Sequence, residues 1–243
     1  MARVEEARAQ MIELFPEGFE EIERVDGVEL VAYTDPRGEE RVWAVFGRTS
    51  ATDVADGWEE RWRDFHRPVR VGSLWIGQPW QEQPPDAIAV VIDPGRAFGT
   101  GAHPTTRLCL ELLEGLPRTG LVDLGCGSGV ISIAAAKLGF DPVFAADADV
   151  NAVASARENA AANDVSVSVS QADALTDDLP ATEVAVANIT RELVEAVARR
   201  GRWPLLVASG YLIHEPAALA GHRHVARRSE AGWAADVFER TGE

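Results

Sequence analysis

The sequence of 243 residues carries a formal net charge of −16 at pH 7, with 46% hydrophobic and 26% charged residues, which is typical of a folded protein. A chain of this length can bury one large core or a smaller core beside a larger one. The negative charge repels phosphate backbones and no basic stripe offsets it, so we expect no direct nucleic-acid binding, whereas a basic protein would be attracted.

Membrane-spanning and exported proteins are also disfavoured. Lys137 interrupts the most apolar helical stretch, which leaves no segment long enough to span a membrane. The acidic N-terminus lacks the apolar core of a signal peptide, so we expect a cytoplasmic protein. Cys109 and Cys126 have no CxxC spacing, and we expect neither a disulfide framework nor a metal site. The lack of an apolar seam predicts a monomer.

Residues 1–50 predict a small α+β domain. A charged helix is expected over residues 3–14, where apolar side chains recur at helical spacing. Asp26-Gly27 is typical of a tight hairpin turn. Two or three strands are expected in this domain, over about residues 19–24, 28–34 and 41–46.

Residues 51–85 predict an aromatic-rich linker between this domain and a larger one. A helix is expected over residues 55–65, because its aromatic side chains share one face. Trp75 and Trp80 follow, and Gln83-Pro84-Pro85 marks the boundary.

Strand and helix patterns alternate through residues 86–243. Helical spacing is clearest after residue 130, where Gly139 is placed to end the helix. This alternation predicts an α/β fold with a doubly wound, mostly parallel, seven-stranded Rossmann-like sheet and helices on both faces. The last two strands are separated only by residues 230–232 and predict an antiparallel hairpin at one edge. Strands are expected over residues 87–92, 120–124, 142–147, 165–170, 183–187, 204–209, 223–228 and 233–239.

A glycine-rich turn gives the first functional signal. Gly125-Cys126-Gly127-Ser128-Gly129 connects an expected strand to an expected helix. Glycines there let the chain turn sharply and bring backbone N–H groups against a ligand with no Cβ in the way. The pattern is G-x-G-x-G, whereas dinucleotide-binding proteins use G-x-G-x-x-G to hold a pyrophosphate at the helix N-terminus.

Asp147 ends the next expected strand, where a carboxylate can accept hydrogen bonds from both hydroxyls of a ribose. The glycine spacing and the closing antiparallel pair favour S-adenosylmethionine, which carries no phosphate, over a nicotinamide dinucleotide. The sequence therefore predicts a site for S-adenosylmethionine at this turn.

Three neighbouring residues keep more than one interpretation. Asp123 could orient the glycine loop or meet the ammonium group of the cofactor, or it could cap the strand end. Asp173 could reach the adenine amino group or could be an ordinary turn aspartate. Cys126 is not expected to be a nucleophile, because the sequence places no His or other base beside it.

Residues 93–106, DPGRAFGTGAHPTT, predict a loop that folds over a ligand and opens a helix. The alternative is a tight turn with an N-terminal cap, which any such helix needs. His103 is the one candidate for a general base near the site, although we favour a structural histidine that caps the helix. No metal is required.

Val186-Ala187-Asn188-Ile189 ends another expected strand. Amino-methylating enzymes of this fold commonly present a polar residue to the acceptor at this place. Taken alone, an asparagine here would more often be a helix cap, so Asn188 needs the other motifs to support a catalytic role.

Together these motifs resemble the PrmA family, which methylates ribosomal protein L11 of the large subunit. The F-G-T-G-x-H-x-T-T loop, the D-x-G-C-G-S-G turn, the pair Asp147 and Asp149, and the A-N-I segment occur in that family's order. The similarity covers about residues 55–240. The loop is specific to the family, whereas the glycine turn is shared by a whole superfamily.

The resemblance implies that Thr106, Gly125, Asp147 and Asn188 contact S-adenosylmethionine, with Asn188 also facing the methyl acceptor. The same site is expected to include Phe98, Gly127, Gly129 and Asp173. The family's N-terminal domain recognises the ribosomal protein. Here that region opens in a helix without a leading strand, and Tyr211 stands where the family usually has an aliphatic residue.

The resemblance thus predicts an N-methyltransferase acting on lysine or N-terminal amines of a basic ribosomal protein. Two alternatives remain at this point. One is a methyltransferase of the same fold acting on another protein or a small-molecule amine. The other is a cofactor-binding interaction module without catalysis.

Overall fold

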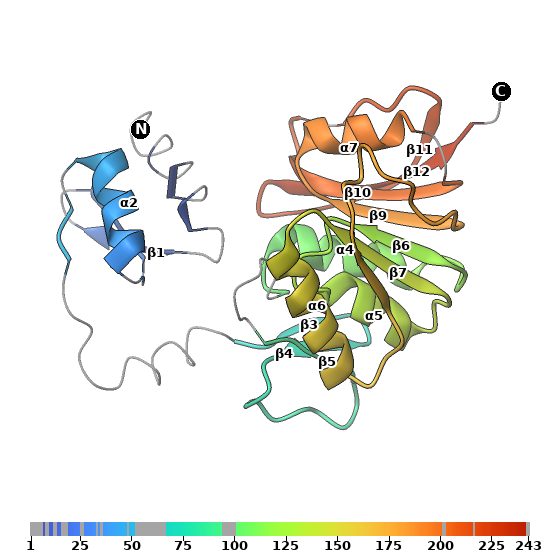
Figure 1. Ribbon diagram of the computed structural model, residues 1–243, viewed down its shortest axis with the longest axis horizontal. Helices are drawn as coiled ribbons and strands as arrows, with labels where there is room; N and C mark the ends of the chain where they lie inside the picture. The colour runs from blue at the N-terminus through green and yellow to red at the C-terminus, as the bar shows by residue number, and fades with distance from the viewer. Residues whose placement is uncertain are drawn as a thin grey trace. The chain divides into compact units, whose positions relative to one another are not determined.

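The computed structural model divides into two compact units, Met1–Phe65 and His66–Glu243, which are described separately (Figure 1). Residues 67–85, expected as linker, thus belong to the larger unit. The structure describes residues 67–93, 101–200, 203–215 and 217–241 of that unit. In the smaller unit it describes residues 7, 10, 11, 14, 15, 19–24, 27–32, 34, 36–47 and 49–51.

The smaller unit contains a β-hairpin and a helix. Strands β1 (Glu20–Arg24) and β2 (Gly27–Val31) pair antiparallel, with Arg24 opposite Gly27, as the hairpin signal predicted. Residues 7, 10, 11 and 14 are helical and Met11 is buried, in line with the helix expected there. The helix expected over 55–65 lies outside the described residues.

The strand expected over residues 41–46 is wrong, because helix α2 spans Pro36–Phe46. The run of valines and aromatic residues near its end favours a strand by composition. Pro36, however, suits the first turn of a helix, and Glu39 lies near the positive end of the helix dipole. These start signals outweigh the β propensity of the last residues.

The larger unit begins with a three-stranded sheet made of β3 (Val69–Val71), β4 (Leu74–Gly77) and β5 (Ile88–Val91). Strands β3 and β4 pair antiparallel, and β4 and β5 pair parallel. Leu74 and Ile76 are buried in the main core, which explains why this Trp- and Pro-rich segment forms strands.

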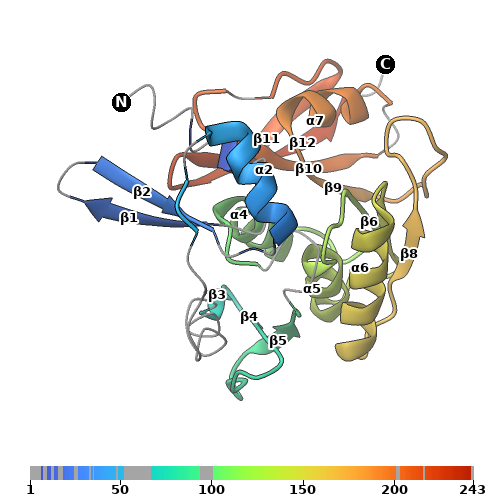
Figure 2. The same cartoon turned by 60° about the vertical axis from the view of Figure 1, so that its left-hand side comes forward.

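The main sheet has seven strands in the order β11-β12-β10-β9-β6-β7-β8 (Figure 2). The pairs among β10, β9, β6, β7 and β8 are parallel, whereas β12 runs antiparallel to both β10 and β11. The predicted doubly wound sheet with a closing hairpin is confirmed. Its strands are β6 (Leu121–Leu124), β7 (Val143–Asp147), β8 (Ser168–Gln171), β9 (Val184–Asn188), β10 (Leu205–Leu212), β11 (His222–Glu230) and β12 (Trp233–Arg240).

Helices cover both faces of this sheet. Buried side chains of α4 (Pro104–Glu114) and α5 (Val130–Leu138) share one core cluster with the strands, and those of α7 (Arg191–Ala198) belong to another. Helix α6 (Val150–Ala162) follows β7 and buries Ala156 and Ala160. Gly139 ends α5 in the left-handed conformation, as its sequence position predicted. Among the described residues, no helix is long and apolar enough to cross a membrane.

Candidate functional site

The register of the central strands brings the predicted site residues to one edge of the sheet. Leu124 of β6 lies opposite both Ala146 of β7 and Ala187 of β9. The residues that follow these three are Gly125 after β6, Asp147 at the end of β7 and Asn188 at the end of β9. Parallel strands end at the same edge, and ligands of open α/β sheets bind outside these carboxyl ends.

The glycine turn has a backbone that other residues would not adopt. Gly125, Gly127 and Gly129 have φ angles of 75°, 53° and 81°. A Cβ on Gly125 would lie 2.5 Å from Ile189 Cγ2, and one on Gly129 would lie 3.1 Å from the Ala156 Cβ of α6. The turn therefore needs glycine for its conformation and for close packing.

Asp147 links this turn to the start of α6. Its Oδ2 accepts a hydrogen bond from the Gly127 N–H at 2.9 Å, and its Oδ1 accepts one from the Asp149 N–H at 2.9 Å. The side chain is only partly buried. A carboxylate has about four lone-pair positions, so these two bonds leave it able to accept two hydroxyl donors. This acceptor capacity fits a ribose.

Asp123 lies beneath the turn and is 1% exposed. Its Oδ2 accepts a 2.6 Å hydrogen bond from Ser132 Oγ in the first turns of α5. Burial raises the pKa of Asp123 to about 6, while the hydrogen bonds from Ser132 act in the opposite direction. Of the roles considered from sequence, these contacts support holding α5 and hence the glycine turn.

Thr106 and Asn188 come together above the end of β9. Asn188 Nδ2 donates to Thr106 Oγ1 at 3.4 Å, a long and therefore weak hydrogen bond. Thr106 is 1% exposed, whereas Asn188 is half-buried and so reachable from solvent. The resemblance placed these two residues in one site, and their side chains are indeed in contact.

His103 is the N-cap of α4, which is the role favoured from sequence. The backbone N–H of Thr105 donates to His103 Nδ1, and the imidazole packs edge-on against Trp233 with ring centroids 4.9 Å apart. Burial, together with the charge of Arg107, lowers the pKa of His103, so the ring is neutral at pH 7.

Two other predicted residues have less structural support in the candidate site. Phe98 lies in residues 94–100, which are outside the described part of the chain. Asp173 is exposed, and its Oδ1 accepts a hydrogen bond from the Leu175 N–H at 2.8 Å. This contact is that of a turn aspartate. Asp173 nevertheless lies close to Asp147, because the Ala172 N–H donates to the Asp147 carbonyl.

The two cysteines are unsuited to nucleophilic chemistry. Cys109 and Cys126 are buried free thiols, and burial, the largest cause, raises the pKa of both well above the usual range. A thiol in this state is a poor nucleophile. Among the described residues, no group of three or more His, Cys, Asp or Glu side chains could hold a metal ion.

Gly210 supports the site in a way that the sequence pattern did not reveal. It sits at a bulge in β10, with φ of 98°, and a Cβ there would lie 1.7 Å from the carbonyl oxygen of Ile189. The backbone after Asn188 can approach β10 only because this side chain is absent. A glycine inside a strand pattern is the signal that could have indicated it.

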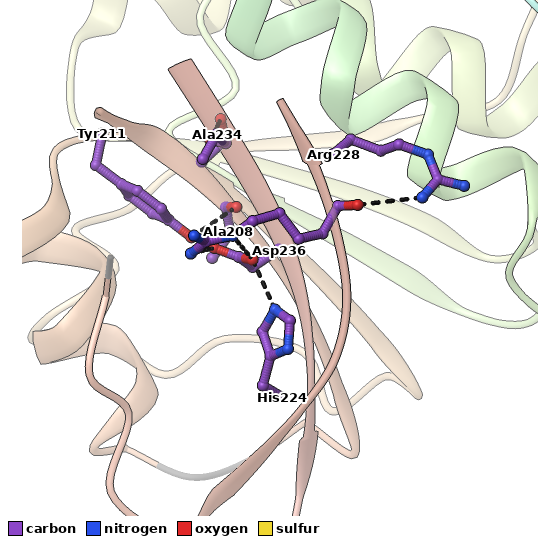
Figure 3. Close-up of polar contacts among 8 residues, drawn as sticks. Ala208, Tyr211, His224, Arg228, Ala234 and Asp236 are labelled. Atoms are coloured by element: carbon purple, nitrogen blue, oxygen red, sulfur yellow. Dashed lines mark hydrogen bonds and ion pairs between the residues drawn. The ribbon is translucent and has the colours of Figure 1, made fainter. Parts of the chain in front are cut away.

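A second polar cluster lies on β10, β11 and β12 (Figure 3). The Tyr211 hydroxyl donates to Asp236 Oδ2 at 2.8 Å, and Arg227 donates to both Asp236 oxygens at 2.7 and 2.9 Å. His224 Nε2 lies 2.7 Å from Asp236 Oδ1. Tyr211, which departs from the family pattern, therefore donates a hydrogen bond to a buried carboxylate.

Comparison with known proteins decides the family. The family model described as "Ribosomal protein L11 methyltransferase (PrmA)" matches residues 15–243. The chain belongs to the PrmA family. The resemblance drawn from the loop, the glycine turn and the A-N-I segment is thereby confirmed.

Curated relatives in the PrmA family match a large part of the chain. A ribosomal protein L11 methyltransferase of Aeromonas hydrophila is 44% identical over 171 residues, which cover 64% of this chain and 56% of the relative. One of Aliivibrio fischeri is 52% identical over 112 residues, covering 44% of this chain and 38% of the relative. The chain thus spans about half the length of the curated relatives that it matches.

A PrmA-family crystal structure agrees with the fold. The ribosomal protein L11 methylase of Lactobacillus delbrueckii subsp. bulgaricus has a TM-score of 0.66 and 25% identity. The match covers 73% of this chain and 100% of that chain. The two proteins therefore share a fold over most of this chain.

Proposed function

We propose that this protein transfers methyl groups from S-adenosylmethionine to lysine or N-terminal amines of ribosomal protein L11. The observation that carries the proposal is the contact between Asn188 and Thr106, one strand away from the glycine turn. An acceptor held by Asn188 would lie beside a cofactor held by that turn. Membership of the PrmA family supports the same activity.

The cofactor would be held mainly by backbone groups and one carboxylate. The turn through Gly125, Gly127 and Gly129 would receive the methionine part, and Asp147 would accept hydrogen bonds from the ribose hydroxyls. Thr106 would border the sulfonium end. Phe98 and Asp173 complete the proposed set, with Asp173 near the adenine.

When bound, S-adenosylmethionine supplies an already activated methyl group, so the protein chiefly has to align the acceptor nitrogen with it. The harder requirement is a neutral amine. A lysine with a pKa of about 10.4 is only about 0.1% neutral at pH 7.5, a cost of about 4 kcal/mol. A site that removes water from the amine lowers its pKa and reduces this cost.

Asn188 would orient the amine. With Nδ2 turned to Thr106, its Oδ1 can accept a hydrogen bond from the acceptor nitrogen. His103 is occupied as the cap of α4, so we propose that the amine proton leaves to water. The acidic N-terminal residues suit a basic target in the cytoplasm, where a monomeric enzyme would meet it.

Labelled S-adenosylmethionine, incubated with the protein and separated ribosomal proteins, tests the proposal. Label on ribosomal protein L11 alone supports it. Label on another protein or on a small amine would instead favour a different acceptor for the same fold. Stoichiometric cofactor binding without any transfer would identify a binding module and contradict the enzyme.

Asn188→Ala tests the mechanism. We expect kcat to fall by about 100-fold or more, because the amine loses its orienting group, while cofactor affinity falls much less. Thr190→Ala is a suitable control, since its exposed side chain makes no capping hydrogen bond to α7. Unchanged turnover in Asn188→Ala would remove this residue from the mechanism.

A further inference from the structure

Helix α6 packs directly against the glycine turn. The closest approach is at Ala156, because a Cβ added to Gly129 would lie only 3.1 Å from the Ala156 Cβ. One turn further along the helix, the side chain of Asn159 is 3% exposed. A carboxamide buried at this depth is costly unless its donor and acceptor groups are paired.

Asn159 pairs both ends of its amide with backbone groups outside α6. Its Nδ2 donates to the Ser128 carbonyl in the glycine turn at 2.9 Å, and its Oδ1 accepts from the Asp93 N–H at 3.0 Å. Asp93 follows β5. One side chain thus connects the cofactor turn with the end of the three-stranded sheet.

Asn163, one helical turn later, provides the natural comparison. Its Oδ1 accepts from the Val91 N–H at 2.9 Å and its Nδ2 donates to the Val91 carbonyl at 2.6 Å, much as a neighbouring strand would. Asn163 is also buried, at 6% exposed. Among the described residues, its hydrogen bonds reach β5 and its own helix, but not the glycine turn.

We propose that Asn159 is a positioning residue for S-adenosylmethionine, acting through the Ser128 carbonyl. The hydrogen bond from Nδ2 fixes the orientation of the peptide group between Ser128 and Gly129. Together with the hydrogen bond from the Gly127 N–H to Asp147, it thereby keeps the backbone of the turn in place. This inference rests on the proposed function and adds a specific residue to it.

The matched pair of variants is Asn159→Ala and Asn163→Ala. We expect Asn159→Ala to raise the Kd and the KM for S-adenosylmethionine about tenfold, the worth of one well-made hydrogen bond. Its kcat at saturating cofactor and its KM for the protein acceptor should stay within about twofold, because Asn188 and Thr106 are intact. Asn163→Ala should lower the melting temperature about as much as Asn159→Ala does. It should nevertheless leave the Kd for the cofactor within about twofold of the wild-type value.

Asn159→Asp separates the two hydrogen bonds of the residue. The aspartate can still accept from the Asp93 N–H, but its second oxygen would face the Ser128 carbonyl with no proton to donate. We expect cofactor affinity to fall at least as much as in Asn159→Ala. Recovery of wild-type affinity in Asn159→Asp would overturn the inference, because it would locate the effect at Asp93.

Calorimetry with S-adenosylmethionine on the full chain, together with melting curves, decides between the outcomes. Equal loss of affinity in the Asn159 and Asn163 variants, following their loss of stability, would overturn the inference.

If the Asn159 variants do not fold, hydrogen exchange on the wild type replaces them. Cofactor should then slow exchange of the Asp93 amide along with the turn amides, and an unchanged Asp93 amide would overturn the inference. Absence of heat with the wild type would instead refute the proposed function.

Discussion

Two buried aspartates of the larger unit show opposite behaviour. Asp123 lies beneath the glycine turn at 1% exposed, and Asp236 lies in the cluster of β10, β11 and β12 at 0% exposed. Burial raises the pKa of Asp123 to about 6. Burial also acts to raise the pKa of Asp236, but hydrogen bonds from Arg227, His224 and Tyr211 outweigh it and the pKa is lowered.

The difference lies in the number and charge of the donors. Asp236 has a bidentate guanidinium, a phenol and an imidazole around it, so its charge is fully compensated. In the part of the chain that the structure describes, Asp123 receives hydrogen bonds from Ser132 alone, and Ser132 carries no charge. Asp236 therefore contributes to stability, whereas the buried charge of Asp123 reduces it.

Asp236→Ala should have the largest effect on stability. The change leaves the Arg227 guanidinium without its carboxylate partner, and we expect a loss of about 3–5 kcal/mol in the free energy of unfolding at pH 7. Since the folded pKa of Asp236 is lowered, its contribution is present above its unfolded pKa and is lost as pH falls through the folded pKa. Urea unfolding at pH 7 measures the loss.

The control for this variant is Glu239→Ala on the same strand. Glu239 pairs with Arg223, and the two side chains are 44% and 64% exposed. An exposed pair of this kind contributes less than about 1 kcal/mol. A similar loss in both variants would contradict the distinction between a compensated buried charge and a surface ion pair.

Asp123→Asn should have a smaller effect of opposite sign. The folded pKa lies above the unfolded value of 3.8, so the native state loses stability as pH rises through the interval up to about 6. An asparagine cannot ionise, and we expect a gain of about 2–3 kcal/mol at pH 8 with little change at pH 4. Urea midpoints at the two pH values provide the measurement.

Ser132→Ala sharpens the test of Asp123. It removes the hydroxyl donor, so the buried carboxylate should cost about 1 kcal/mol more at pH 8. The two ends of one hydrogen bond would thus give stability changes of opposite sign. A loss of stability in both variants would show that Asp123 is compensated like Asp236.

Tyr211→Phe should have the smallest effect and should make the pKa of Asp236 more like that of Asp123. The ring stays packed while one donor to Asp236 is lost, for which we expect about 1 kcal/mol of destabilisation. The acid unfolding midpoint should rise, because the pKa of Asp236 moves up. An unchanged midpoint would exclude the phenol from the charge compensation.

The sheet was predictable because strand and helix patterns alternate strongly after residue 86. Predictions failed where local composition and tertiary packing disagree. Residues 41–46 look like a strand but complete the helix α2 that Pro36 begins. Strands β3 and β4 have three and four residues, too short for a pattern, and are held by the burial of Leu74 and Ile76.

The site was predictable at the strand ends, where Gly125 and Asp147 follow directly from their motifs. The contact between Thr106 and Asn188 depends on strand order, which periodicity alone does not determine. Asn159 and Asn163 were missed because polar residues at helical spacing usually mark a solvent face. Their low helix propensity beside so many alanines was the available signal.

Gly210 sets a limit on how this protein can be engineered. Its neighbour across the strand is a main-chain oxygen, which no change of rotamer can move aside. Libraries that aim to broaden the range of acceptors should therefore keep the glycine codon at 210.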